Sequence, residues 1–350
     1  MKTSFYQYSL KDLQNIFAAH SLPPSGPGLM FNWHYKKGHQ APCLIDLARS
    51  SIEFVRDNFH FDLPTIDTIQ ESEDKTVKFL FKLSDGKKIE TVLIPFNGKY
   101  SVCLSSQVGC AMNCSFCHTG LQGLARHLTT GEIIGQFMSV KLWLKAHRPD
   151  DDRIQNIVFM GQGEPLHNFD AVKTACEIFL SQHGLSVADH KITISTAGYL
   201  PGLERWKNEM PSVNIALSLH STLKEKRDVL IPINRRYPLE EVMKYVESIP
   251  QGRKRFVTYE YLLIKDFNDS EEDAHLTAKY LQGKKPLVSL IPFNPFPGSA
   301  FKRPEMPKVE RFKAIMDSYR IPAFIRVTKG DEILAACGQL NSKAQPDSKV

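Results

Sequence analysis

Three cysteines stand close together in the first half of the chain, Cys110, Cys114 and Cys117, at the spacing C-x3-C-x2-C. Three thiolates can ligate three irons of a 4Fe–4S cube and leave the fourth iron open to a substrate, whereas most electron-transfer clusters use four cysteines. We therefore expect one oxygen-sensitive [4Fe–4S] cluster at these residues, with its chemistry at the open iron.

Two other uses of these cysteines have to be weighed. The run from Cys114 to His118 also spells C-x-x-C-H, the attachment motif of c-type haem, but that use leaves Cys110 idle and requires export. Zinc could take the three cysteines with His118 as a fourth ligand. Structural zinc sites usually join two C-x-x-C pairs, however, and the chain contains no second pair. Both readings are less favoured than the cluster.

The composition is that of an ordinary globular protein. The chain has 350 residues, 42% of them hydrophobic and 23% charged, with a formal net charge of +6. The mild excess of positive charge permits a nucleic-acid partner without proving one, because only local clustering makes a binding surface. We see no secretory signal and no apolar run long enough to span a bilayer, so we expect a cytoplasmic protein without a membrane partner. Seven cysteines in the reducing cytosol then indicate metal ligation or catalysis rather than a disulfide framework.

Strand-like and helical segments alternate from Tyr100 onward, which favours a parallel sheet with crossover helices. We therefore expect an α/β protein built as a partial (β/α) barrel, with its chemistry at the C-terminal ends of the strands. The expected strands are 100–106, 154–160, 190–196, 213–219, 256–264 and 287–293, and the expected helices are Thr130–Ala146, Phe169–Gln182, Leu239–Glu247, Glu271–Leu281 and Lys308–Tyr319. The cysteine triad falls in the loop after the first of these strands.

The segments on either side of this core complete the expected organisation. Residues 1–75 look helical with turns and form a small accessory domain that could contact RNA. Asp85-Gly86 between two β-rich runs predicts a β-hairpin extension over 76–99, with Glu90 on its second strand. The barrel core then covers 100–340, and the polar tail 341–350 is expected to be disordered.

The cysteine spacing is that of the radical S-adenosylmethionine (SAM) superfamily. The run Gly161-Gln-Gly163-Glu164-Pro165 follows the second strand, where the superfamily carries its motif for the SAM amino group. Over residues 75–340 the resemblance becomes closer. The runs CLSSQVGCAMNCSFC, FMGQGEPLHN, LIPFNPFPG and GDEILAACGQL look like the RNA adenine methyltransferases of the RlmN type, which modify carbon 2 of adenosine. A sister family of the Cfr type methylates carbon 8. The GEP and FNPFPG motifs of this chain resemble those of the carbon-2 branch more closely.

The resemblance implies catalytic roles for three further residues. Cys337 matches the cysteine that accepts a methyl group from one SAM, while a second SAM is cleaved at the cluster to a radical that abstracts hydrogen from this S-methyl group. The resulting methylene radical adds to the adenine. Cys103 matches the cysteine that resolves the protein–RNA crosslink and leaves a Cys103–Cys337 disulfide to be reduced. Glu90 matches the base that removes the carbon-2 proton. Taken singly, the two cysteines would pass for core residues and Glu90 for a solvated one.

The chemistry itself supports a radical route. An aromatic C–H at an electron-poor carbon is neither nucleophilic nor acidic, so ordinary methyl transfer from SAM cannot reach it. A thioether tether makes the addition intramolecular, which gives a large gain in effective concentration. A base must then collect the proton.

The resemblance also implies the residues that contact SAM, and most of them fall at the ends of expected strands. The expected contacts are Gly163, Glu164, Ser195, Ser218, Leu219, His220 and Asn294. The substrate is expected to be 23S ribosomal RNA. Whether transfer RNA, at the adenosine beside the anticodon, is a second substrate stays open, because the segment after Cys337 is short and the N-terminal region matches the family loosely.

Basic clusters could contact the phosphates of such an RNA, although solvated surface charge explains them equally well without the family. They are Lys87-Lys88, Arg126-His127, Arg235-Arg236, Arg253-Lys254-Arg255, Lys284-Lys285 and Lys302-Arg303. We further expect an external electron donor and a monomeric enzyme. Two alternatives remain: a carbon-8 methyltransferase, and an RNA-binding Fe–S or zinc protein without turnover.

Overall fold

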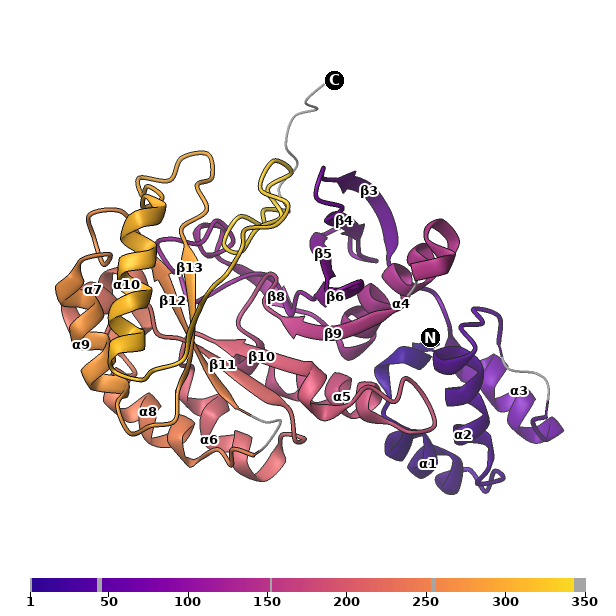
Figure 1. Cartoon of the computed structure of the whole chain (residues 1–350). Helices are drawn as coiled ribbons and strands as arrows, with labels where there is room; N and C mark the ends of the chain where they lie inside the picture. The colour runs from indigo at the N-terminus through magenta and orange to yellow at the C-terminus, as the bar shows by residue number, and fades with distance from the viewer. Residues whose placement is uncertain (1, 43–45, 152, 253–255, 343–350) are drawn as a thin grey trace.

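The computed structural model describes residues 2–42, 46–151, 153–252 and 256–342 (Figure 1). In this part of the chain, ten strands form one sheet in the order β14-β13-β12-β11-β10-β9-β6-β5-β4-β3. The strands from β6 to β14 pair in parallel and those from β3 to β6 pair antiparallel. The strands are β3 Thr65–Glu71, β4 Val77–Lys82, β5 Lys88–Phe96, β6 Lys99–Cys103, β9 Ile154–Phe159, β10 Ile192–Thr196, β11 Asn214–Ser218, β12 Val257–Leu263, β13 Leu287–Pro292 and β14 Ala323–Ile325.

Crossover helices connect the parallel strands, and Figure 1 shows α6 to α10 on the outer side of the curved sheet. Their bounds are α4 Thr130–His147, α5 Phe169–Leu180, α6 Leu200–Glu209, α7 Lys224–Leu230, α8 Leu239–Ser248, α9 Glu271–Leu281 and α10 Met306–Ser318. The sheet does not close on itself, since β14 and β3 lie at opposite edges. The prediction of an α/β partial barrel is therefore confirmed.

Several elements described for the core were not predicted: the helices α6 and α7, the strand β14, and the short strands β7 Gln107–Gly109 and β8 Leu124–His127. Helix α6 starts Leu200-Pro201-Gly202, a sequence that resembles a turn. A Cβ on Gly202 would lie 2.6 Å from the main-chain oxygen of Leu166, so the close packing of this helix requires glycine. The same glycine thus makes the start of α6 resemble a turn in the sequence and allows the helix to pack closely in the fold.

The predicted hairpin is present as β4 and β5, and its turn is closed by hydrogen bonds between Leu83 and the residues Gly86 and Lys87. A third strand, β3, pairs with β4 and widens the extension. The sequence analysis placed this stretch among helices and turns, because TIDTIQE is polar and its residues are mostly exposed at the sheet edge. The boundary drawn at residue 75 therefore falls between two paired strands.

The N-terminal region is helical, with α1 Leu10–Ala19, α2 Gly26–Phe31 and α3 Arg49–Asn58. It also contains a short parallel pair of strands, β1 Thr3–Ser4 and β2 Phe59–His60. Its core is aromatic: the ring of His34 stacks on Phe61 with centroids 4.3 Å apart and packs against Phe5 at 4.7 Å. A 3₁₀ turn at residues 5–7 joins this core to α4.

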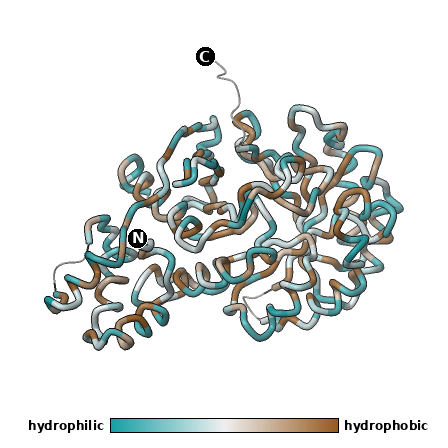
Figure 2. Tube along the Cα trace, turned by 180° about the vertical axis from the view of Figure 1, so that it is seen from behind, coloured by the Kyte–Doolittle hydropathy of each residue, from teal (hydrophilic) through white to brown (hydrophobic). Residues whose placement is uncertain are grey.

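Figure 2 shows hydrophilic and hydrophobic residues mixed along the helices of the chain. No helix within the described ranges combines the length and the apolar character needed to cross a membrane.

Candidate active site

A small antiparallel hairpin, β7 Gln107–Gly109 and β8 Leu124–His127, holds the loop that carries the three cysteines. Gly109 has φ +77°, and a Cβ there would lie 1.9 Å from the carbonyl oxygen of Gly123. The next residue, Cys110, donates its N–H to this same oxygen at 3.0 Å. Glycine at position 109 therefore permits the tight closure at the base of the cysteine loop.

Cys110, Cys114 and Cys117 all line one cavity of about 140 Å³. Cys110 and Cys114 are each 9% exposed, and burial raises the pKa of Cys110 to about 12. Burial also raises the pKa of Cys114, and the neighbouring thiols Cys117 and Cys110 raise it further. Burial disfavours free thiolates here, whereas the positively charged iron–sulfide core of a cluster would stabilise all three thiolates. The residues therefore fit the iron–sulfur cluster expected here.

The structure does not favour the zinc alternative. His118, which would have been the fourth ligand, instead stacks on Phe296 with centroids 4.7 Å apart. Its Nε2 lies 2.8 Å from the side-chain amide nitrogen of Asn341.

The Gly-Glu-Pro run after β9 enters the same cavity. Gly163 has φ +103°, and a Cβ there would lie 2.6 Å from Cβ of Gln107, so only glycine fits. The carboxylate of Glu164 accepts the N–H of Ala197 at 2.8 Å and that of Leu166 at 3.1 Å. Burial raises the pKa of Glu164 to about 7. A bound ammonium would favour its charged form.

Three of the other expected SAM contacts also line the cavity: Ser195, Ser218 and His220. The ring of His220 accepts the N–H of Leu262 at its Nδ1, at 3.0 Å, and burial lowers its pKa to about 3. It is therefore neutral.

Leu219 and Asn294 are buried but are not among the residues that line the cavity. The side-chain nitrogen of Asn294 donates to the carbonyl oxygen of Cys337 at 3.2 Å. The structure thus places Asn294 against the cysteine segment rather than in the cavity.

Cys337 lies at the cavity, and Cys103 lies close to it although the two are far apart in sequence. Cys103 ends β6, is 7% exposed, and packs in one apolar cluster with Ala335 and Leu340 on either side of Cys337. Both thiols are free. Burial raises the pKa of Cys103 to about 12, and a Cys337 thiolate would raise it further, so the two thiols are near enough to interact electrostatically.

Two charged residues of the site were missed in the sequence analysis. Arg326 donates to Glu260 at 3.0 Å, and Ser195 donates to the other oxygen of that carboxylate, also at 3.0 Å. The Cys337 sulfur, as a thiolate, is the strongest of the charges that raise the pKa of Arg326, and the Cys103 sulfur contributes as well. The guanidinium therefore lies near both thiols. A lone glutamate within the apolar strand FVTYEYLLI was the signal that could have revealed Glu260.

Glu90 is buried, at 3% exposed, rather than solvated on its hairpin. One carboxylate oxygen lies 3.2 Å from Nζ of Lys78, and the other accepts the N–H of Asn341 at 2.6 Å. Burial raises the pKa of Glu90 while Lys78 and Asn341 oppose that rise. Figure 1 shows the C-terminal segment between β13 and the extension, and the hydrogen bond from Asn341 joins this segment to Glu90.

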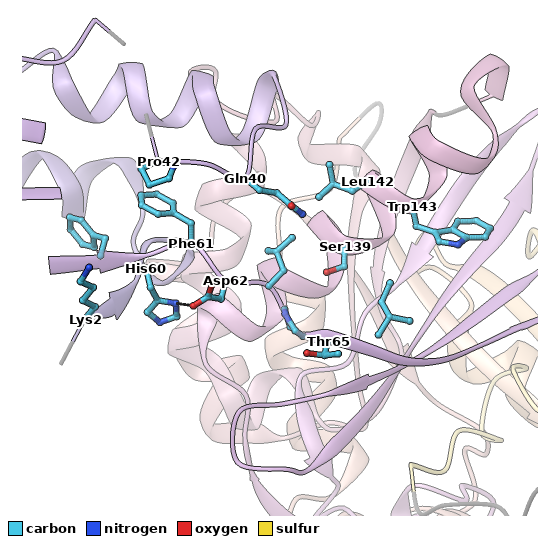
Figure 3. A pocket seen from close by; sticks show the side chains of 14 residues that line it. Lys2, Gln40, Pro42, His60, Phe61, Asp62, Thr65, Ser139, Leu142 and Trp143 are labelled. Carbon is cyan, nitrogen blue, oxygen red and sulfur yellow. Dashed lines mark ion pairs between the residues drawn. The ribbon is translucent and has the colours of Figure 1, made fainter. Parts of the chain in front are cut away.

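A second, larger cavity of about 920 Å³ lies between the N-terminal region, the start of β3 and α4 (Figure 3). Its lining includes Lys2, Trp143 and the pair His60 and Asp62, whose side chains lie 3.1 Å apart. None of the cysteines or expected SAM contacts lines it. We therefore assign the chemistry to the smaller cavity.

Several of the expected basic clusters are neutralised by nearby acids. Arg126 pairs with Asp85 and Glu132, Lys88 with Asp67, and Lys284 with Glu247. Arg235 and Arg236 are exposed, and no ion pair joins either of them to an acid in the described part of the chain. The cluster at 253–255 lies outside the described residues.

The class of protein follows from the fold and the site together. A cysteine triad and a Gly-Glu-Pro loop line one cavity beside the C-terminal ends of parallel strands, and a family model described as "Radical SAM superfamily" matches residues 104–278. The chain is therefore a radical SAM protein. The solved structure of a radical SAM methyltransferase from Sphaerobacter thermophilus superposes with a TM-score of 0.87, at 35% identity, covering 97% of this chain and 100% of that one.

Curated relatives define the family more narrowly. The chain is 39% identical to a probable dual-specificity RNA methyltransferase RlmN of Aquifex aeolicus, over 96% of both proteins. It is 44% identical to the corresponding protein of Akkermansia muciniphila, over 83% of this chain and 82% of that protein. The chain belongs to the RlmN family of SAM-dependent RNA methyltransferases, and the carbon-8 alternative is not favoured.

Proposed function

We propose that this enzyme methylates carbon 2 of adenosine in 23S ribosomal RNA and in transfer RNA beside the anticodon. The observation that carries the proposal is that two free thiols far apart in sequence, Cys337 and Cys103, lie near each other beside the cavity of the cysteine triad. A radical SAM enzyme that only generates a radical has no use for this second pair of thiols. The relatives from Zymomonas mobilis and Paracoccus denitrificans are dual-specificity RNA methyltransferases, which supports two RNA substrates.

Cys110, Cys114 and Cys117 would hold the cluster, and Gly163, Glu164, Ser195, Ser218 and His220 would line the place of SAM. When bound, these groups supply a methyl cation equivalent, an organic radical that abstracts a hydrogen atom, and a one-electron acceptor. Each turnover uses two SAM molecules, since the methyl group and the radical come from different ones.

The cysteines carry out the covalent steps. The Cys337 sulfur takes a methyl group, and after loss of one hydrogen atom its S-bound carbon bonds to carbon 2 of the adenine. Later the Cys103 thiolate attacks the Cys337 sulfur, so that an S–S bond forms and the S–CH₂ bond breaks. The electron pair of the broken bond stays on carbon, which takes up a proton and becomes the methyl group. An external dithiol then reduces the disulfide.

Glu90 acts between these two events. The carbon-2 hydrogen leaves as a proton to a Glu90 oxygen, while the electron pair of the C–H bond stays in the ring. One electron then departs, which restores the aromatic system. A carboxylate that is buried and therefore weakly solvated is a stronger base than one in water, which suits this role.

The test is an anaerobic reaction of the reconstituted enzyme with SAM, a reductant and a 23S RNA fragment or transfer RNA. Mass spectrometry of the nucleosides is expected to show 2-methyladenosine in both. The appearance of 8-methyladenosine would instead support the sister activity, and the absence of any methylated nucleoside would contradict the proposal. The accompanying expectations are an external single-electron donor, a monomer, a cytoplasmic location, and an RNA contact made by residues 1–75.

A further inference from the structure

Lys78 is a buried lysine that the steps above do not use. It lies in β4, is 6% exposed, and stands in a strand whose next lysine, Lys82, is exposed. A buried charge is costly unless an opposite charge compensates it. The compensating group is Glu90, whose Oε1 lies 3.2 Å from Nζ of Lys78, with both side chains at least nine-tenths buried.

The same ammonium reaches the segment that carries Cys337. Nζ of Lys78 donates to the carbonyl oxygen of Leu334 at 3.4 Å. Leu334 lies three residues before Cys337 and has φ +52°, a backbone conformation that a leucine rarely adopts without support. One side chain therefore connects the carboxylate of the extension to the backbone of the cysteine segment.

The other groups around Glu90 leave Lys78 as its counter-charge. Asn341, from the C-terminal segment, gives the carboxylate a neutral N–H. Ser105 and Gln162 bond to the main chain of Glu90 rather than to its carboxylate. His118 is one step removed, behind the side chain of Asn341, and the thiol of Cys103 lies on the neighbouring strand β6 opposite Val92.

We propose that Lys78 is a positioning residue for the methylation: its ammonium holds Glu90 as an aimed carboxylate and fixes that carboxylate relative to the Cys337 segment. The inference rests on the proposed role of Glu90 as the base at carbon 2. Without the charge of Lys78, burial alone acts on Glu90, so its pKa rises and the carboxylate forms only at higher pH.

The experiment follows the breakdown of the protein–RNA crosslink in single turnovers of the full-length, cluster-loaded enzyme with a methylated Cys337, from acidic to alkaline pH. In Lys78→Met, we expect the rise of the profile to move to higher pH, so that on its acidic limb crosslink breakdown slows about tenfold for each unit by which the pKa rises. At pH ~9 the difference is expected to shrink to about threefold or less, because the carboxylate then forms without help. Lys78→Arg keeps the charge and is expected to keep the wild-type pH profile.

The matched control is Lys82→Met, which removes the exposed lysine at the end of the same strand, β4. Its profile is expected to follow that of the wild type, and deoxyadenosine release is expected to be equal in all variants. A Lys78→Met profile that coincides with the wild type, or lies below it by the same factor at every pH, would overturn the inference.

Two further outcomes separate the inference from the proposal on which it rests. If the wild type makes no 2-methyladenosine, the proposed function fails and the role of Lys78 fails with it. If the wild type makes the product and the profile of Lys78→Met does not shift, only the role of Lys78 fails. Should Lys78→Met not fold, Lys78→Gln replaces it under the same criteria.

Discussion

At the scale of single residues, the two thiols outside the triad differ in their surroundings. Cys337 is half-buried at the cavity, whereas Cys103 is buried among apolar side chains. Burial raises the pKa of Cys103 and favours its protonated form, and Arg326 is the cation that lowers this pKa toward the thiolate. A protonated thiol is a poor nucleophile, which suits the late step that the proposed mechanism gives to Cys103.

This arrangement predicts the behaviour of two single variants. Cys103→Ala leaves radical addition intact but removes the attacking thiolate, so the protein is expected to copurify covalently bound to RNA. Cys337→Ala cannot form the tether and is expected to carry no RNA and make no methyladenosine. Denaturing gels after nuclease treatment distinguish the two. Cys176→Ala, at a buried cysteine of α5, is the control; a crosslink in Cys337→Ala would contradict the tethered mechanism.

The site residues could be predicted to different degrees. The triad was visible because its spacing is rare, and Cys337, Cys103 and Glu90 were visible only through the resemblance. Lys78, Glu260 and Arg326 were missed: Glu260 and Arg326 lie far apart in sequence, and Lys78 meets Glu90 only across the folded hairpin. Burial of a charge is a property of the folded chain, and the sequence shows only that the charge interrupts an apolar run.

At the scale of elements, the alternation of strands and helices predicted the barrel because apolar runs and helix starts were both distinct. The predicted helix Glu271–Leu281 matches α9 at both ends, and Ser270 and Asp273 form a capping box at its N-terminus. The prediction missed β14, which has only three residues, and the edge strand β3, which is polar. The domain boundaries stay a prediction. Contacts between elements, rather than propensity, decide such short pieces.

The hairpin β7–β8 gives a prediction at this scale. In Gly109→Ala, a methyl group would meet the oxygen of Gly123 and the residue would be strained at φ +77°, so the loop cannot close. We expect a folded protein that binds less than about half of the iron, with a loss of at least about 1 kcal/mol in stability. Iron analysis and thermal unfolding measure both. Gly86→Ala, at a turn with φ +81° but open space, is the control for strain alone; equal iron content in the two variants would refute this account.

At the scale of the whole molecule, the site is assembled from three distant parts of the chain. The cysteine loop follows β6, Glu90 and Lys78 come from the extension, and Cys337 comes from the C-terminal segment. The antiparallel pairing of β5 with β6 joins the extension to the barrel sheet. This pairing places the strand that carries Glu90 next to the strand that carries Cys103, so the extension is part of the proposed active site.

The charge of the whole molecule gives the last prediction. The net charge is +6, and many surface bases are paired; Arg235 and Arg236 are exposed, and no ion pair within 4.0 Å joins either of them to an acid in the described part of the chain. They follow α7, whose last residue, Leu230, accepts the N–H of Ser115 at its carbonyl oxygen, so the segment that leads to them begins beside the cysteine loop. Arg236 also covers the ring of Tyr237 at 5.3 Å.

If these two arginines contact phosphates, they contribute to the decrease in RNA affinity as the salt concentration rises. Each phosphate contact contributes a slope of about −0.7 to −0.9 in log affinity against log salt. The double variant Arg235→Gln, Arg236→Gln is expected to bind RNA more weakly and with a slope shallower by about 1.5, since two contacts are lost. Filter binding across a salt series measures it. Arg205→Gln, at an arginine already paired with Asp170 and Glu209, is expected to keep the wild-type slope, and an unchanged slope in the double variant would place the RNA elsewhere.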